Sequence, residues 1–97
     1  MAQSIMQKYE NGQIVKKCYL TGRTDNLDKH HIFLNAFRNK SEEWGCWCLL
    51  NHEVHMRLHQ TKEGQAVLRV LKQQAQEQFE RRYGHEKFME VFKRNYL

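Results

Sequence analysis

The chain contains no proline and only three cysteines among its 97 residues. An odd number of cysteines, with no hydrophobic signal segment ahead of them, argues against a framework of disulfide bonds and favours a reducing compartment. No apolar run approaches the roughly 20 residues that a membrane-spanning helix needs, so we expect a soluble, cytoplasmic protein with no membrane partner. The sequence also lacks repeats, low-complexity tracts and linkers, which predicts one domain over residues 1–97.

Positive charge exceeds negative charge, with 16 Lys and Arg against 11 Asp and Glu, a formal net charge of +5 and a pI of about 9.3. This balance favours a polyanionic partner, nucleic acid first, although small domains also carry such charge for solubility alone. Hydrophobic residues make up 40% of the chain, which predicts a compact core. A core this small often relies on a bound metal or on disulfides for extra stability.

Two short apolar segments, which contain "HHIF" and "CWCLL", predict strands at 27–34 and 46–50. Between them, residues 35–45 have the composition of a loop with one helical turn. Ahead of them, the Asn-Gly pair at 11–12 predicts a turn, and the segment 13–22 predicts another strand.

The remaining sequence is helical in pattern. Asn51 is a candidate N-cap for a helix that runs through His59. A longer helix is predicted up to Gly84, a residue typical of helix ends, and a last short helix follows it. The apolar stripe of the long helix recurs at four-residue steps; its members are Val67, Leu71, Ala75, Phe79 and Tyr83. The last helix uses Phe88, Val91 and Phe92.

Five of the six histidines lie between Asp28 and His59. His55 and His59 are four residues apart, so a helix places both imidazoles on one face, at the spacing of two ligands of one metal ion. His30 or His31, from the preceding strand, could supply a third ligand. Three protein ligands leave an open position for water or substrate, as in catalytic sites, whereas four close the site and make it structural.

Three other groups of residues leave alternatives open. His52 lies on the same helical face and could replace a ligand, contact phosphate or face solvent, whereas His85 has no partner in sequence and is expected at the surface. The cysteines at 18, 46 and 48 could hold a second, structural zinc ion, but they lack the CxxC pairs typical of such sites and are more simply buried apolar residues.

The segments "HHI", "CWCLLN" and "HEVHMRLH" together resemble the HNH, or ββα-metal, nucleases. The resemblance covers residues 18–60, and the all-histidine set is most similar to the colicin-type members. The pattern of "TGR", "HHIF" and "SE..G" is also similar to small phage and prophage HNH proteins. This resemblance implies a bacterial or phage-infected cell.

The resemblance implies a role for each matching residue. His30 would be the first metal ligand, His31 the general base, and His55 and His59 the ligands from the helix. The implied cofactor is one divalent ion, with Zn²⁺ favoured in a three-histidine site and Mg²⁺, Mn²⁺ or Ni²⁺ as alternatives.

One position departs from the family pattern. The middle Asn, which orients the base, falls near Cys46 in this sequence. Asn35, Asn39 or Asn51 could take its place, or a main-chain carbonyl could hold the imidazole.

Basic residues are candidates for binding the phosphates of DNA. Arg38 or Lys40, in the loop between the two halves of the site, could hold a phosphate oxygen during catalysis. Arg81 and Arg82 belong to the basic residues of the C-terminal helices, which carry much of the spare positive charge. Because these basic residues are scattered and not concentrated on one recognition helix, we expect DNA binding that is not sequence-specific.

The sequence thus predicts an α+β domain with a ββα-metal (His-Me finger) core at 18–60 and a helical brace at 63–97. The leading function is metal-dependent cleavage or nicking of DNA. The alternative is a catalytically silent HNH fold that binds DNA or a protein, as a phage accessory factor or inhibitor would. A purely structural zinc domain is a third class.

Overall fold

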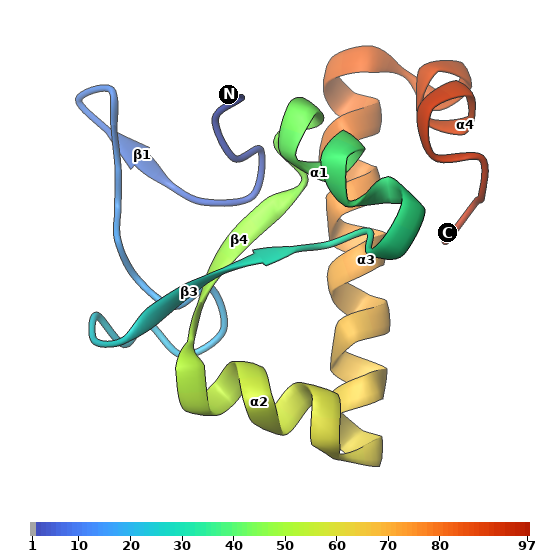
Figure 1. Ribbon diagram of the computed structural model, residues 1–97. Coiled ribbons are helices and arrows are strands. Elements are labelled where there is room, and N and C mark those ends of the chain that lie inside the picture. The colour runs from blue at the N-terminus through green and yellow to red at the C-terminus, as the bar shows by residue number, and fades with distance from the viewer. Residues whose placement is uncertain (1) are drawn as a thin grey trace.

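The computed structural model describes residues 2–97 as a small α+β domain with two antiparallel sheets of two strands each and four α-helices. The larger hairpin pairs β3 (Leu27–His31) with β4 (Trp47–Asn51), in the register that sets His30 opposite Cys48. The smaller hairpin pairs β1 (Tyr9–Glu10) with β2 (Gln13–Ile14) (Figure 1). The predicted α+β class is therefore confirmed.

The strand expected over 13–22 is wrong beyond Ile14. The chain instead makes a tight turn, in which the Cys18 amide donates to the Arg23 carbonyl at 2.7 Å and the Gly22 amide donates to the Cys18 carbonyl at 2.8 Å. These local hydrogen bonds satisfy backbone groups that a longer strand would instead pair with a neighbouring strand. The predicted Asn-Gly turn is present, with φ of 52° at Asn11 and 78° at Gly12.

The loop expected at 35–45 is instead helical, with a 3₁₀ turn η1 (Asn35–Phe37) followed by α1 (Arg38–Trp44). A buried serine explains the difference. The Ser41 hydroxyl accepts from the Phe33 amide at 3.0 Å and donates to the Phe33 carbonyl at 2.8 Å, which holds α1 against the end of β3. The helix ends at Gly45, which has a left-handed conformation with φ of 74°.

Asn51 caps α2 (His52–Gln60) as predicted, because its side-chain oxygen accepts from the amides of Glu53 and Val54. The next helix, α3 (Lys62–Tyr83), follows after a sharp corner. Gly64 permits this corner, since a Cβ atom there would lie 2.4 Å from the Leu58 carbonyl oxygen.

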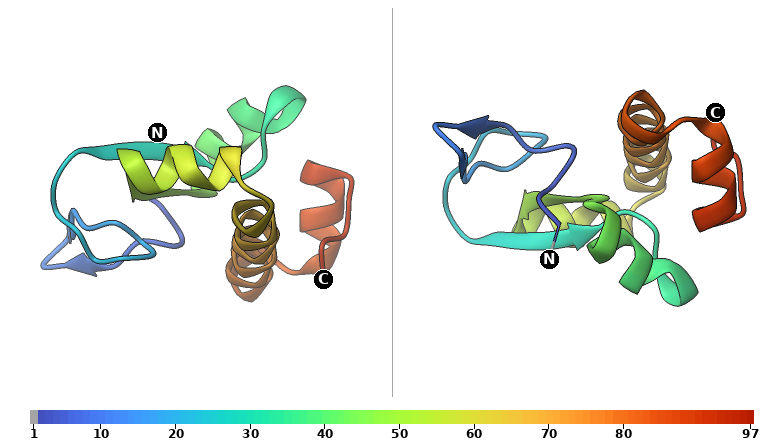
Figure 2. Two further views of the ribbon diagram at one scale, coloured as in Figure 1. Left: turned by 90° about the horizontal axis from the view of Figure 1, so that it is seen from below. Right: turned by 90° about the horizontal axis from the view of Figure 1, so that it is seen from above.

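The chain ends with α4 (His85–Phe92), which begins after the predicted stop at Gly84. Figure 2, which looks along α3, shows the β3–β4 hairpin and α2 on one side of this helix and α4 on the other. Aromatic residues fill the space between them; four are at most 2% exposed, namely Phe33, Phe79, Phe88 and Phe92. Among the described residues, no helix combines the length and apolar character needed to cross a membrane.

Candidate metal centre

Three histidines from β3 and α2 gather at one point, and they are the three predicted as ligands. The ring centroid of His30 lies 5.0 Å from that of His55 and 5.9 Å from that of His59, and the latter two centroids are 5.0 Å apart. One ligand nitrogen from each ring lies within 4.8 Å of the others. Around a tetrahedral zinc ion the nitrogens are about 3.4 Å apart, so small ring rotations would bring these three to binding distance.

Local sequence explains why the three rings meet. The cap at Asn51 starts α2 directly at the end of β4, and β4 is paired with β3, so the hairpin register fixes α2 relative to His30. The four-residue spacing of His55 and His59 then turns both rings to the same side of the helix. In the part of the chain that the structure describes, no other three His, Cys, Asp or Glu side chains gather in this way.

Burial keeps His30 in the form that binds metals. His30 is only 3% exposed, and this burial, together with the neighbouring His55 and His59, lowers the pKa of its imidazole to about 4. Burial and His55 also lower the pKa of His59. Neutral imidazoles have the free lone pair that a metal ion needs, so His30 and His59 are ready to bind one near pH 7.

Asp28 orients one of the candidate ligands, and sequence reasoning missed it. Its Oδ2 lies 3.0 Å from Nδ1 of His55 and 2.8 Å from Nδ1 of His52. The hydrogen bond from His55, and then that from His52, lowers the pKa of the Asp28 carboxyl, which stays ionised. A proton held on Nδ1 of His55 leaves Nε2 free for the ion. The signal was present, because Asp28 precedes His30 by two positions and so shares its face of β3.

His52 is therefore the partner of Asp28 and lies outside the group of three, with its side chain 50% exposed.

Replacing Asp28 with Ala is expected to weaken metal binding by about 10- to 100-fold, because His55 would lose the group that fixes its tautomer and orientation. Competition with a chromophoric chelator measures this affinity. Asp25→Ala is a matched control, since the Asp25 carboxylate pairs with Arg23 in an exposed turn. Equal affinities of the two variants would contradict the role given to Asp28.

His31, the predicted base, does not belong to the cluster. Because neighbours on a strand point to opposite faces, its ring leaves the hairpin on the other side from His30. There its Nε2 lies 2.9 Å from Oε1 of Glu42, and Lys29 bonds both oxygens of the same carboxylate at 2.9 and 3.0 Å. The hydrogen bond with His31, followed by Lys29, lowers the pKa of Glu42.

Glu42 is thus the group that orients His31, and sequence reasoning missed it because α1 was expected to be a loop. Asn51 uses its side chain to cap α2 and to bond the Asp25 carbonyl. Asn35 and Asn39 lie exposed in η1 and α1. Cys46, at the expected Asn position, is fully buried, and burial raises the pKa of its thiol to about 12, so it is a neutral core residue.

Among the described residues, the cysteines do not belong to any group of three possible metal ligands. All three are free and buried, and burial raises the pKa of Cys48 to about 12 as well.

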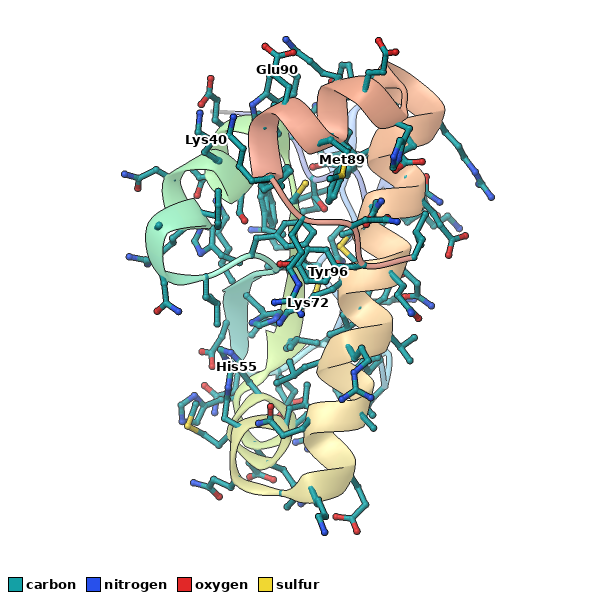
Figure 3. The ribbon with its side chains drawn as sticks, turned by 90° about the vertical axis from the view of Figure 1, so that its right-hand side faces the viewer. Lys40, His55, Lys72, Met89, Glu90 and Tyr96 are labelled. Carbon is teal, nitrogen blue, oxygen red and sulfur yellow. The ribbon has the colours of Figure 1, made fainter. Side chains whose placement is uncertain are left out.

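A groove of about 450 Å³ opens beside His30 and His59. Its basic residues are Arg69, Lys72 and Arg94. Figure 3 shows Lys72 and Tyr96 on the same side of the molecule as His55.

The basic residues chosen from the sequence lie elsewhere. Arg38 and Lys40 are exposed on α1, and neither lines this groove. Arg81 and Arg82 are exposed in the last turn of α3, and Arg82 lines a different hollow beside the N-terminal residues 2–5.

No family model, curated protein or solved structure matches this chain. The geometry defines a small α+β domain whose three clustered histidines lie close enough together to bind one divalent ion. A three-ligand set, unlike a closed set of four, leaves a coordination position for water or substrate.

Proposed function

We propose that the chain is a metal-dependent DNA endonuclease or nickase of the HNH, ββα-metal class. The observation that carries the proposal is the meeting of His30 from β3 with His55 and His59 from α2, with His30 and His59 also lining a basic groove. In this proposal residues 18–60 form the metal-binding core, and α3 and α4 brace it. The phosphodiester is the expected substrate because positive charge and a divalent ion meet at one place.

Zn²⁺ is the favoured ion because all three candidate ligands are imidazoles, with Mg²⁺, Mn²⁺ or Ni²⁺ as alternatives. When bound, such an ion neutralises charge on the scissile phosphate and on the departing oxygen.

The proposed base is His31. In its neutral form, Nε2 donates a hydrogen bond to Glu42 at 2.9 Å, which leaves the lone pair of Nδ1 free. Because the His31 and His30 rings leave opposite faces of β3, the proposal requires the bound substrate to place the attacking water against Nδ1 of His31. Glu42 then stabilises the imidazolium that forms, because its carboxylate is kept ionised by His31 and Lys29. In other enzymes, too, a hydrogen-bonded carboxylate orients the histidine that acts as general base and stabilises its protonated form. Basic residues beside the cluster would hold the phosphate oxygens.

A second candidate function is a catalytically silent HNH-type module that binds DNA or another protein. The observation in its favour is that His31 and His30 leave opposite faces of the hairpin, with His31 engaged by Glu42. In that case the metal would only stabilise the fold, and the basic groove would only bind.

Plasmid nicking decides between these two functions. We expect the wild-type protein to convert supercoiled plasmid to the relaxed or linear form in the presence of Zn²⁺, Mn²⁺, Mg²⁺ or Ni²⁺, and to leave it supercoiled after chelation. The physical reason is that charge on the phosphate is neutralised only when the ion is present. Failure to cut in every ion of the panel, by protein with verified metal content, would establish the binding module instead.

A further inference from the structure

The groove beside the metal centre is lined by three cations and by no acidic residue. None of Arg69, Lys72 and Arg94 forms an ion pair with any carboxylate in the part of the chain that the structure describes. Some other cations are neutralised within the protein, as Lys29 is by Glu42. Uncompensated cations that converge on a concave surface attract an anion.

One wall of the groove is the segment that follows α4. Lys93 has a left-handed conformation with φ of 66°, which turns the chain back toward α3. The fully buried Gln76 of α3 then holds this segment. Its Nε2 donates to Oδ1 of Asn95 at 2.7 Å, and its Oε1 accepts from the Tyr96 amide at 2.8 Å. Arg94 and Asn95 are thereby held opposite α3, and the groove is a built feature of the fold.

The groove extends away from the metal centre. A second hollow of about 310 Å³ is lined by residues 33–37 and shares Leu34, Lys72, Arg94 and Tyr96 with the first. Lys72 and Arg94 also flank the Tyr96 ring, at 5.7 Å and 5.2 Å from its centroid. The two hollows are therefore adjacent, and we refer to them together as the basic path; His30 and His59 line the first hollow, and Lys72 and Arg94 line both.

The groove has apolar surface as well as charge, since Ile32, Leu34 and Leu68 line it beside the cations. A duplex presents mainly phosphates and sugars to a protein groove, whereas an unpaired strand also presents the apolar faces of its bases. Grooves that combine positive charge with apolar or aromatic surface are typical of single-strand binding.

We propose that this path binds the phosphates of an unpaired polynucleotide strand, with Lys72 and Arg94 as the main phosphate contacts and Gln76 as the residue that positions the second wall. The inference rests on the proposed function, because it names the substrate form that would reach the same metal centre.

Fluorescence anisotropy of a labelled 12-nucleotide strand tests the proposal, in a His31→Ala background so that cleavage does not consume the probe. Replacing Lys72 and Arg94 with Gln is expected to weaken binding by more than about ten-fold and to reduce the slope of log affinity against log salt by about 1.4, which is about 0.7 for each lost phosphate contact. The single variant Arg94→Gln, at an exposed position of the tail, should lose about half of that slope.

The matched control removes the same two charges at Lys16 and Lys17, which are exposed and lie outside the groove. It should weaken binding by less than about three-fold, because distant charges are screened. Equal losses in the control and groove variants would overturn the proposal, and so would a duplex of the same sequence that binds as tightly as the single strand. Anisotropy does not depend on cleavage. If the Lys72 and Arg94 variants bind the strand more weakly but the wild type does not nick plasmid, only the nuclease proposal is overturned. If the wild type nicks plasmid but these variants bind the strand normally, only the proposal of single-strand binding is overturned.

Discussion

Removing the metal ion with a chelator is expected to lower the melting temperature of this protein by about 15–30 °C. An ion present at about 1,000 times its dissociation constant stabilises the folded state by about 4 kcal/mol. In a domain of this size each kcal/mol corresponds to about 4–8 °C. Structurally, the ion would join β3 to α2 through His30, His55 and His59. Without it, the two elements are held together by packing and by the hydrogen bonds of Asp28 with His52 and His55.

Thermal unfolding followed by circular dichroism, with and without chelator, measures the effect. The His55→Ala/His59→Ala protein is the control, because it lacks two of the three ligands and its melting temperature should not respond to the chelator. The alternative is that the apolar core, which includes residues of α3 and α4, stabilises the fold without the ion. An unchanged melting curve after verified removal of the ion would show that it does.

The second large effect is expected at His31. Its replacement by Ala should lower the rate of plasmid nicking by about 10²- to 10⁴-fold, the usual contribution of a general base. Metal content should stay at the wild-type level, because the His31 ring lies on the opposite face of β3 from His30. Glu42→Gln keeps a hydrogen-bond acceptor for His31 but loses the charge, and its rate should fall between those of wild type and His31→Ala.

His85→Ala is a matched control for the loss of one imidazole, since His85 is exposed and bonds only to Glu80. Its nicking rate should equal that of the wild type. If His31→Ala cuts as fast as His85→Ala, then the base lies elsewhere and the pair of His31 and Glu42 is structural.

The parts of the fold that sequence predicted correctly depend on local signals. The Asn51 cap, the spacing of His55 and His59 and the stop at Gly84 each act within one or two helical turns, so they can be recognised without knowing the fold. The resulting helix pattern also predicted the buried faces of α3 and α4, but it was wrong at Tyr83, which lies in the last turn of α3 and is 47% exposed.

The parts that sequence missed depend on contacts between distant segments. Glu42 meets His31 only because Ser41 holds α1 against the chain after β3, and this contact spans eight residues across a turn. The basic groove depends on Gln76, whose side chain folds the C-terminal segment back onto α3. One glutamine among the several polar residues of α3 carries no pattern that would reveal this role.

Elemental analysis of the purified protein and of its His55→Ala/His59→Ala variant shows directly whether the three histidines hold a metal ion. We expect one divalent ion per chain in the wild type and almost none in the variant, because a single remaining imidazole at His30 cannot hold the ion. Undiminished metal content in the variant would contradict the three-histidine centre.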